Sequence, residues 1–306
     1  MARVCDHTSQ MKAHPQFGLL LATFGALVLT PDALFMRISG MDGMQMLGWR
    51  GLSMGSLFLL VWLATSAHRR VDLTVLASGT GLIVVACQFV NATLFPTGIA
   101  LAPVSVVLVS VATVPVWSAV LARVIYSERT SRATWITIVA VLIGIAIAVS
   151  GKGEAALNTS AFVGALCGLG VAFTLAMNFV TLRNSGNVPI LLCIGCGALM
   201  AGINGLIWTG PERMLDGTVW AIALTGALIL PVSFFALSLA SRYTAAANVS
   251  LLMLLETVIG PLWVWICIGE VPTPRMLIGG ALVLTSLAAY LLANDHAARR
   301  RLSQIA

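Results

Sequence analysis

The feature that most constrains this chain is a long segment without charge. From Leu73 to Ala122 the sequence contains no Asp, Glu, Lys or Arg. Across all 306 residues only 9% are charged and 59% are hydrophobic, whereas soluble domains carry about 25% charged residues. So little charge cannot cover a surface that faces water, and the sequence therefore predicts an integral membrane protein.

The apolar segments have the length of membrane-spanning helices. A helix needs about 20 apolar residues to cross a hydrocarbon core about 30 Å thick. Backbone groups in lipid must bond within their own segment, and the alternating pattern of a membrane barrel is absent. We therefore predict an all-α membrane protein of ten transmembrane helices, at residues 17–38, 46–66, 73–94, 99–123, 134–150, 161–182, 188–208, 218–240, 244–267 and 276–293.

Glycine and proline mark the expected turns between these helices. Pro96-Thr97-Gly98 is expected to divide the charge-free segment, and Gly210-Pro211 is expected to follow the seventh helix. Gly151-Lys152-Gly153 and Pro272-Thr273-Pro274 mark two further turns. Prolines within the predicted helices are expected to kink them; these are Pro103, Pro115, Pro189, Pro231 and Pro261.

The distribution of basic residues predicts the orientation. With the N-terminus in the cytoplasm, the external segments carry Arg37, Arg50, Lys152, Arg213 and Arg275, and the other Lys and Arg residues lie inside. Because cytoplasmic loops are enriched in Lys and Arg, we predict a bacterial-type inner (plasma) membrane protein with both termini in the cytoplasm. The net charge of +6 is then explained by topology and contact with anionic lipid headgroups, and no nucleic-acid partner is expected.

Ten helices can divide into two halves of five, and an odd number places the second half upside down relative to the first. Glu128 and Glu270 lie 142 residues apart, each after a long apolar helix, as such a repeat requires. The predicted organisation is a cytoplasmic segment 1–16, a first repeat 17–150, an external linker 151–160, a second repeat 161–293 and a cytoplasmic basic tail 294–306.

Several short motifs resemble those of a known family. They are Thr30-Pro31-Asp32, Trp49-Arg50-Gly51, Pro115-Val116-Trp117, Ser127-Glu128-Arg129, and the run from Leu251 through Glu256-Thr257 and Gly260-Pro261-Leu262-Trp263 to Gly269-Glu270. Over roughly residues 17–293 the chain resembles the drug/metabolite transporter superfamily in its ten-helix, EamA-type branch. The chain departs from it at Glu256-Thr257, where the family often has Glu-Pro, and at Ser127-Glu128, where Gly-Glu is usual. The resemblance implies transport of amino acids or other small metabolites, with export as the expected direction.

Two ionisable residues are predicted at membrane depth, where charge is costly and commonly functional. Asp32 lies in the outer half of the first helix and Glu256 lies near the middle of the ninth. Asp32 has two interpretations, a structural ion pair with Arg37 or Arg50, or a residue of the transport pathway. Glu256 has the same two kinds of interpretation, and for it we favour a structural group that locks helices together. We hypothesise that Asp32 and Arg50 form part of an outer gate and that Glu256 lines or latches a central cavity.

Uncharged polar and aromatic residues give further candidates. Gln88 and Asn91 lie three residues apart and therefore share one face of a helix, and Asn178 lies in the sixth predicted helix. Such groups also form bonds between helices without contacting cargo. Trp117 and Trp263 are candidates for the cavity wall.

Other classes of function are disfavoured. His7, His14, His68 and His296 lie outside the predicted spans, so no zinc-hydrolase site is expected within them. The pair Cys193 and Cys196 is read as packing rather than metal or redox chemistry. No Walker motif is present, so ATP is not expected to drive transport, and no cofactor or metal is predicted.

The sequence therefore favours a secondary transporter or facilitator that works by alternating access around a cavity between the repeats. Its expected partners are a small-molecule substrate and the lipid bilayer. Proton coupling through Glu256 or Asp32 stays open. The alternatives are a multi-pass sensor or assembly protein without transport, and an integral-membrane enzyme.

Overall fold

The structure is a computed structural model that describes residues 15–101, 107, 110–149, 159–269 and 274–303. These residues form helices joined by short turns, and no strand occurs among them. The helices are α2 (Pro15–Leu29), α3 (Asp32–Ser39), α4 (Gly43–Thr65), α5 (Arg69–Leu76), α6 (Gly79–Leu101), α8 (Val114–Tyr126), α9 (Arg132–Val149), α10 (Thr159–Asn184), α11 (Ile190–Thr209), α12 (Val219–Leu224), α13 (Leu230–Tyr243), α14 (Ala246–Met253), α15 (Leu255–Ile268) and α16 (Pro274–Ser303). A π-helical turn at Thr225–Ile229 joins α12 to α13, so this helix is continuous from Val219 to Tyr243.

Seven helical segments of the described residues are long and apolar enough to cross a membrane. They are Gln16–Ser39, Gly43–Thr65, Gly79–Leu101, Phe162–Asn184, Ile190–Thr209, Val219–Tyr243 and Ala246–Ile268. Three shorter apolar helices accompany them, at Val114–Tyr126, Arg132–Ile147 and Leu277–Tyr290. The predicted all-α membrane fold is therefore confirmed at the level of a multi-pass helical protein.

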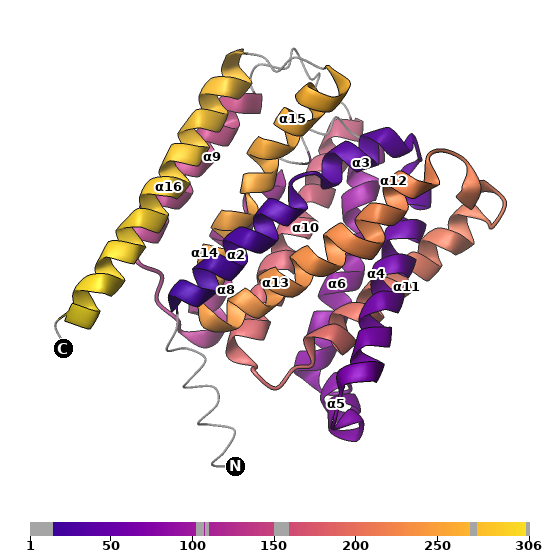
Figure 1. Cartoon of the computed structure of the whole chain (residues 1–306), viewed down its shortest axis with the longest axis horizontal. Helices are drawn as coiled ribbons and strands as arrows, with labels where there is room; N and C mark the ends of the chain where they lie inside the picture. The colour runs from indigo at the N-terminus through magenta and orange to yellow at the C-terminus, as the bar shows by residue number, and fades with distance from the viewer. Residues whose placement is uncertain (1–14, 102–106, 108–109, 150–158, 270–273, 304–306) are drawn as a thin grey trace.

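The bundle has two ends, which we name after the short helices found there. The α5 end also holds the start of α2, the turn between α10 and α11, and the last turns of α16 (Figure 1). The α3 end also holds the connection between α11 and α12 and the start of α16 (Figure 1). The described parts of the chain therefore begin and finish at the same end of the bundle.

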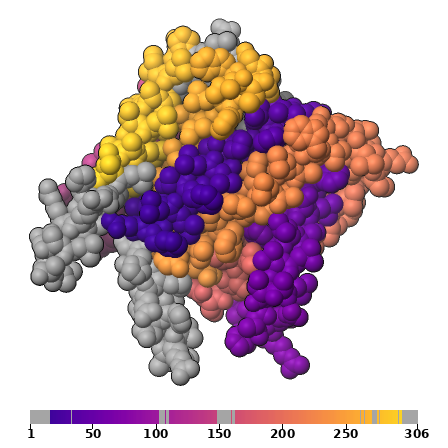
Figure 2. Space-filling view, viewed as in Figure 1, coloured from indigo at the N-terminus to yellow at the C-terminus, as the bar shows by residue number. Residues whose placement is uncertain are grey.

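Helices far apart in sequence pack in pairs. α4 packs along α11, α6 along α10, α2 along α13, and α9 along α16. In Figure 2, α2 and α13 cross the viewed face as two adjacent diagonal bands, one indigo and one orange. The α9–α16 pair lies at the edge of the bundle (Figure 1).

Glycines bring α4 and α11 into backbone contact. A Cβ atom built on Gly51 would lie 2.4 Å from the backbone nitrogen of Gly202, and one on Gly205 would lie 2.4 Å from that of Gly48. A Cβ on Gly55 would lie 2.5 Å from the backbone nitrogen of Leu199. Small residues permit such close approach in membranes, where van der Waals packing takes over from the hydrophobic effect between helices. Gly51 and Gly55, four residues apart in the sequence, therefore form a packing seam.

Two of the predicted helices are interrupted near their middle. The first is broken at Thr30-Pro31 between α2 and α3, because Pro31 has no N–H for the helical ladder. The ninth is broken at Leu254 between α14 and α15. Thr30 and Leu254 are 3% and 1% exposed, so both breaks lie inside the protein rather than against lipid.

The predicted turn at Pro96-Thr97-Gly98 is wrong. α6 starts at Gly79, after the separate helix α5, and continues through Pro96 to Leu101. The hydroxyl of Thr97 donates to the carbonyl of Thr93 at 2.7 Å, which helps a membrane helix to accommodate proline. The predicted helix 73–94 is shifted accordingly. Within the predicted helix 99–123 the described residues 107, 110 and 111 are helical, and α8 begins at Val114.

The other predicted boundaries agree with the structure to within a few residues, with one exception. α16 continues to Ser303, so most of the predicted basic tail 294–306 is helical. The marker Gly151-Lys152-Gly153, most of the linker 151–160, Pro103, and Pro272 and Thr273 lie outside the described residues. Pro115 lies in the first turn of α8 and Pro189 caps the start of α11, where proline is tolerated. Pro231 lies inside the continuous helix Val219–Tyr243, two residues after the π-helical turn that ends at Ile229.

Replacing Gly51 by Ala is expected to destabilise the protein, because the new methyl group would overlap the backbone of α11. The expected cost is about 1–3 kcal/mol, as for overpacking elsewhere. Thermal unfolding in detergent, followed by loss of the monodisperse gel-filtration peak, measures it. Gly79→Ala is the matched control, because nothing lies within 4 Å of its added Cβ; equal midpoints for the two variants would contradict the packing seam.

Candidate functional site: a polar cavity at the α3–α4 corner

The cavity lies where the α2–α3 break, α4, α6 and the α14–α15 break meet. Its volume is about 80 Å³, several times the roughly 10–15 Å³ that one buried water requires. Its polar lining comprises Asp32, Arg50, Gln88, Asn91 and Glu256. The other lining residues are Leu29, Leu47, Gly51, Met54, Ala92, Phe95, Pro96, Val111, Val171, Leu175, Ala198, Leu230, Phe234 and Met253.

An ion pair between Asp32 and Arg50 is at the centre of this lining. Arg50 Nη2 lies 2.8 Å from Asp32 Oδ2, and the two side chains are 12% and 2% exposed. Asp32 opens α3, and Arg50 lies two turns into α4. Gly40, at φ +62°, caps α3 in a left-handed conformation that favours glycine and so helps the chain to turn back. Of the two partners considered for Asp32, the structure pairs it with Arg50.

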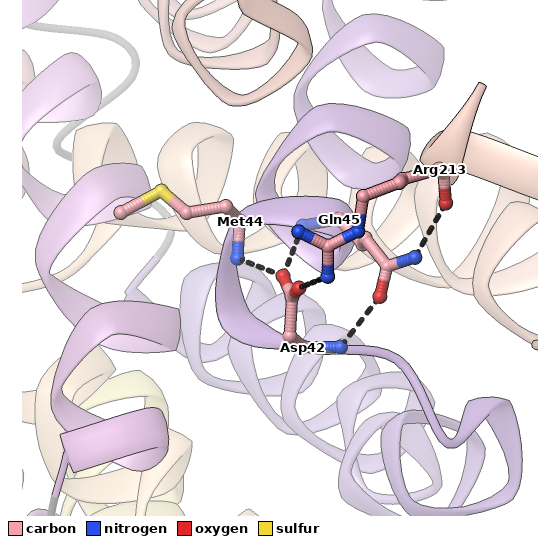
Figure 3. Close-up of polar contacts among 4 residues, drawn as sticks. All are labelled: Asp42, Met44, Gln45 and Arg213. Atoms are coloured by element: carbon pink, nitrogen blue, oxygen red, sulfur yellow. Dashed lines mark hydrogen bonds and ion pairs between the residues drawn. The ribbon is translucent and has the colours of Figure 1, made fainter. Parts of the chain in front are cut away.

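A polar clasp fixes the α3–α4 corner to the connection between α11 and α12 (Figure 3). Asp42 caps α4, since its Oδ1 accepts from the N–H groups of Met44 and Gln45, both at 2.9 Å. Arg213 Nη2 donates to Asp42 Oδ2 at 3.0 Å, and Gln45 Nε2 donates to the carbonyl of Arg213 at 2.5 Å. The clasp therefore holds the helix that carries Arg50 against the second half of the chain.

Glu256 lies in the first turn of α15, directly after the break at Leu254. Negative charge is favoured at a helix N-terminus, because unpaired N–H groups point towards it. Asp32 and Arg50 both interact electrostatically with Glu256. The cavity thus contains two carboxyl groups and one guanidinium group.

Several polar atoms of this cavity are buried without a hydrogen-bond partner among the described residues. They are Asp32 Oδ1, Arg50 Nη1 and Gln88 Oε1. Buried polar groups are nearly always satisfied by protein or by ordered water. The arrangement can therefore accept hydrogen bonds at two oxygens and donate one charge-assisted bond from the guanidinium.

Three of the eight candidates from the sequence do not line this cavity. Trp117 packs edge-to-face on Phe173, with ring centroids 5.6 Å apart. Trp263 Nε1 donates to Thr30 Oγ1 at 2.9 Å, which joins α15 to the break after α2. Asn178 is buried on α10, outside the cavity lining.

A second polar cluster, which was not predicted from the sequence, lies at the α5 end. There Arg183 pairs with Glu128 at 3.4 Å. Arg183 and Arg242 lie in the last turns of α10 and α13. In the sequence they were interpreted only as basic residues that indicate membrane orientation, and no contact between them was predicted. Only the fold shows that these helices end side by side.

The described cysteines differ in burial: Cys167 and Cys193 are buried, whereas Cys267 is exposed. Cys87, Cys167, Cys193, Cys196 and Cys267 are free thiols. Among the described residues, no group of three or more His, Cys, Asp or Glu side chains is arranged to hold a metal ion.

A bundle of apolar helices around an internal polar cavity defines a multi-pass membrane protein. Residues 16–150 match the model of the EamA-like transporter family. This segment, close to the first half of the chain, is therefore similar to that family, in agreement with the resemblance noted in the sequence.

Two further comparisons agree with that relationship. The chain is 26% identical over 181 residues to a Bacillus subtilis (strain 168) protein named "Uncharacterized transporter YdfC". This match covers 57% of the chain and 58% of that relative. A solved structure titled "Crystal structure of protein" superposes with a TM-score of 0.73 at 18% identity, over 91% of this chain and 97% of that one. At this identity the superposition shows only that the two chains share a fold, over both halves of this chain.

Neutralising one member of the Asp32–Arg50 pair is expected to destabilise the protein strongly, because the other charge stays buried and unpaired. Asp32→Asn and Arg50→Gln are each expected to cost about 3–5 kcal/mol. The double variant is expected to recover part of that loss, measured by thermal unfolding in detergent. Arg213→Gln, in an ion pair whose side chains are 63% and 45% exposed, is the control and should cost no more than about 1 kcal/mol. Additive losses in the double variant would argue against the pair.

Proposed function

We propose that the protein is a secondary transporter or facilitator for a small polar metabolite, an amino acid or a related compound. Export across the inner membrane is the proposed direction, and alternating access between two five-helix repeats is the proposed mechanism. The observation that carries the proposal is the buried Asp32–Arg50 pair, which lines an internal cavity and keeps one polar atom of each partner free.

The charges of the cavity suit a zwitterion with an apolar side chain. A free guanidinium N–H of Arg50 can receive the carboxylate of the cargo through a charge-assisted hydrogen bond. Asp32 Oδ1 and the carboxyl group of Glu256 can receive its ammonium group. The remaining wall is mostly Leu, Val, Met and Phe, which is typical of a small-molecule site with a few orienting polar groups.

Two matched intervals support an inverted repeat. Ser127 caps α8 at φ +54° and Gly269 caps α15 at φ +83°, and these two positions lie 142 residues apart, the same interval as Glu128 to Glu270. The starts of α9 and α16, at Arg132 and Pro274, have the same separation.

The helix pairs have the corresponding symmetry. With α2–α9 as the first repeat and α10–α16 as the second, the pairs α2–α13 and α6–α10 exchange when the two repeats are interchanged. The pairs α4–α11 and α9–α16 each join a helix to its own counterpart. Three shorter apolar helices would complete the ten spans of such an arrangement by thinning the bilayer locally.

The charge at the two ends supports a cytoplasmic location for the α5 end. Arg69 and Arg70 open α5, and Arg183 and Arg242 lie in the last turns of α10 and α13 at this end. An excess of basic residues is typical of cytoplasmic loops.

Reporters fused to the two termini are expected to test this topology. A C-terminal green fluorescent protein should fluoresce and a C-terminal alkaline phosphatase should stay inactive, because the first folds in the cytoplasm and the second needs an oxidising compartment. The same pair of reporters at the N-terminus should behave identically. Opposite reporter results at the N- and C-termini would place the termini on opposite sides of the membrane, and would rule out an even number of membrane spans.

Counterflow in proteoliposomes tests the proposed activity. Vesicles loaded with an unlabelled amino acid should accumulate the same labelled amino acid, over a panel with apolar, aromatic, acidic and basic side chains. Glu256→Gln is expected to lower the initial rate on the order of tenfold, as the loss of one charge-assisted contact worth about 1.5–3 kcal/mol would do. Glu212→Gln, an exposed carboxyl in the α11–α12 connection, is the control and should keep the wild-type rate.

Two outcomes of that assay would count against the proposal. No accumulation across the whole panel would favour a protein that senses or assembles rather than transports. Wild-type rates in Glu256→Gln would remove that carboxyl group from the transport mechanism.

A further inference from the structure

The cavity face of α10 continues as a polar stripe towards the α5 end. Val171 and Leu175 of α10 line the cavity, four residues apart. Asn178 and Thr181 follow at intervals of three, so all four side chains lie along one face of the helix. The two polar residues are 2% and 1% exposed and lie outside the cavity lining.

Two helices next to α10 repeat this pattern. On α13, Phe234 lines the cavity, and Ser238 lies one turn further towards the α5 end. On α14, which runs in the opposite direction, Met253 lines the cavity and Ser250 precedes it by three residues. α10 packs against both α13 and α14, and α13 packs against α14. Three adjoining helices therefore each present an apolar cavity residue followed by a small polar residue at the same level.

Three of these four polar residues are buried with an oxygen that has no hydrogen-bond partner among the described residues, namely Asn178 Oδ1, Thr181 Oγ1 and Ser238 Oγ. The Ser250 hydroxyl is satisfied, because Oγ donates to the carbonyl of Ala246 at 2.7 Å and lies 2.6 Å from Ser118 Oγ of α8. A core that served only for packing would be more stable with apolar side chains of the same size at such positions. Buried oxygen atoms without hydrogen-bond partners, placed one after another from the cavity outwards, are expected where water or a polar solute passes when the protein adopts another conformation.

A cluster of arginines closes the stripe at the α5 end. Arg183 Nε lies 3.4 Å from Glu128 Oε1, which follows the cap of α8. Arg183 Nη1 donates to the carbonyl of Arg242 at 2.9 Å, and Arg242 in turn donates to the carbonyl of Val188 in the turn before α11. These bonds tie the ends of α8, α10, α13 and the start of α11 together.

The ion pair in this arginine cluster is largely buried. The Arg183 and Glu128 side chains are 12% and 28% exposed, much less than those of the Arg213–Asp42 pair at the α3 end. Glu128 Oε2 and Arg242 Nε have no hydrogen-bond partner within the part of the chain that the structure describes, so the cluster is not fully satisfied there in this conformation. An incompletely satisfied buried network costs free energy that another conformation can recover.

We propose that Asn178, Thr181, Ser238 and Ser250 line the closed half of the translocation pathway, from the cavity to the α5 end, and that the Arg183–Glu128 pair with Arg242 is its latch. This inference rests on the proposed transport function. It assigns Asn178 a contact with water and cargo outside the cavity, and it assigns Glu128 and Arg183 the control of access.

Cysteine accessibility tests the latch without any cargo. Thr181→Cys and Ser238→Cys are made singly, and the protein is placed in lipid nanodiscs, where both ends meet a water-soluble maleimide. Peptide mapping by mass spectrometry reads each new thiol separately from the six native cysteines. Labelling should be slow in the otherwise wild-type protein, because both positions are buried.

Adding Glu128→Gln should speed labelling at both positions on the order of tenfold, a shift within the range of couplings between conformational states. Arg183→Gln breaks the same pair from the other side and should have the same effect. Arg213→Gln, which breaks the exposed pair at the α3 end, should leave both rates unchanged. Thermal midpoints and gel-filtration profiles accompany every variant, so that labelling is compared only between folded proteins.

The outcomes separate this inference from the proposed transport function. Unchanged labelling in folded Glu128→Gln and Arg183→Gln variants would overturn the latch, whether or not counterflow is observed. Equal acceleration by Arg213→Gln would also overturn it, because the effect would then be general loosening. Faster labelling in the latch variants alone supports the closed half-pathway, even where the amino-acid panel gives no counterflow and the proposed cargo is abandoned.

Discussion

The pairing of Asp32 with Arg50 is the interaction on which the arrangement of the cavity depends. A single charge in the interior of a membrane protein carries a desolvation penalty of several kcal/mol, so each of these residues requires the other. Their distance of 2.8 Å fixes the first turn of α3 against the second turn of α4. The clasp of Asp42, Gln45 and Arg213 then fixes the same corner to the α11–α12 connection (Figure 3). The pair that defines the cavity is thereby held by both halves of the chain.

Tight packing and interrupted helices occupy different parts of the bundle. Along α4 and α11 the glycines allow backbones to touch, which leaves no room for solvent or cargo. Around the cavity the helices are broken, at Thr30-Pro31 and at Leu254, so that Asp32 and Glu256 both lie in first turns of helices rather than in helix interiors. Polar backbone is tolerated at membrane depth only where protein or a wet cavity surrounds it. The breaks are therefore tolerated because a cavity adjoins them, and the cavity takes Asp32 and Glu256 from the helices that begin at the breaks.

The sequence predicted most of the cavity because ionisable and amide residues are rare in apolar segments. Asp32, Gln88, Asn91 and Glu256 were identified on that ground, and Arg50 was identified as a partner of Asp32 in an outer gate; all five line one cavity. Trp117 and Trp263 were not distinguishable from cavity residues by sequence, because an aromatic ring at membrane depth packs equally well against Phe173 or beside Thr30.

Glu128 and Arg183 were missed as a pair, because they are 55 residues apart and each has a simpler explanation at a helix end. Pro96 was misread as a turn, because a threonine hydroxyl one turn earlier can accompany proline within a membrane helix.

Hydrophobic periodicity and charge are local properties, and they determined the helical class, the approximate position of each apolar segment and the scarcity of polar residues within them. Local properties cannot determine which residues meet across the bundle. Tertiary structure alone decided that Asp32 pairs with Arg50 rather than Arg37, that Glu256 faces that pair, and that α10, α13 and α14 pack against one another. The physical reason is that the sequence of a helix determines which side chains lie on each of its faces. Which other helix packs against a given face depends on how all the helices pack together in the protein interior, from which water is excluded.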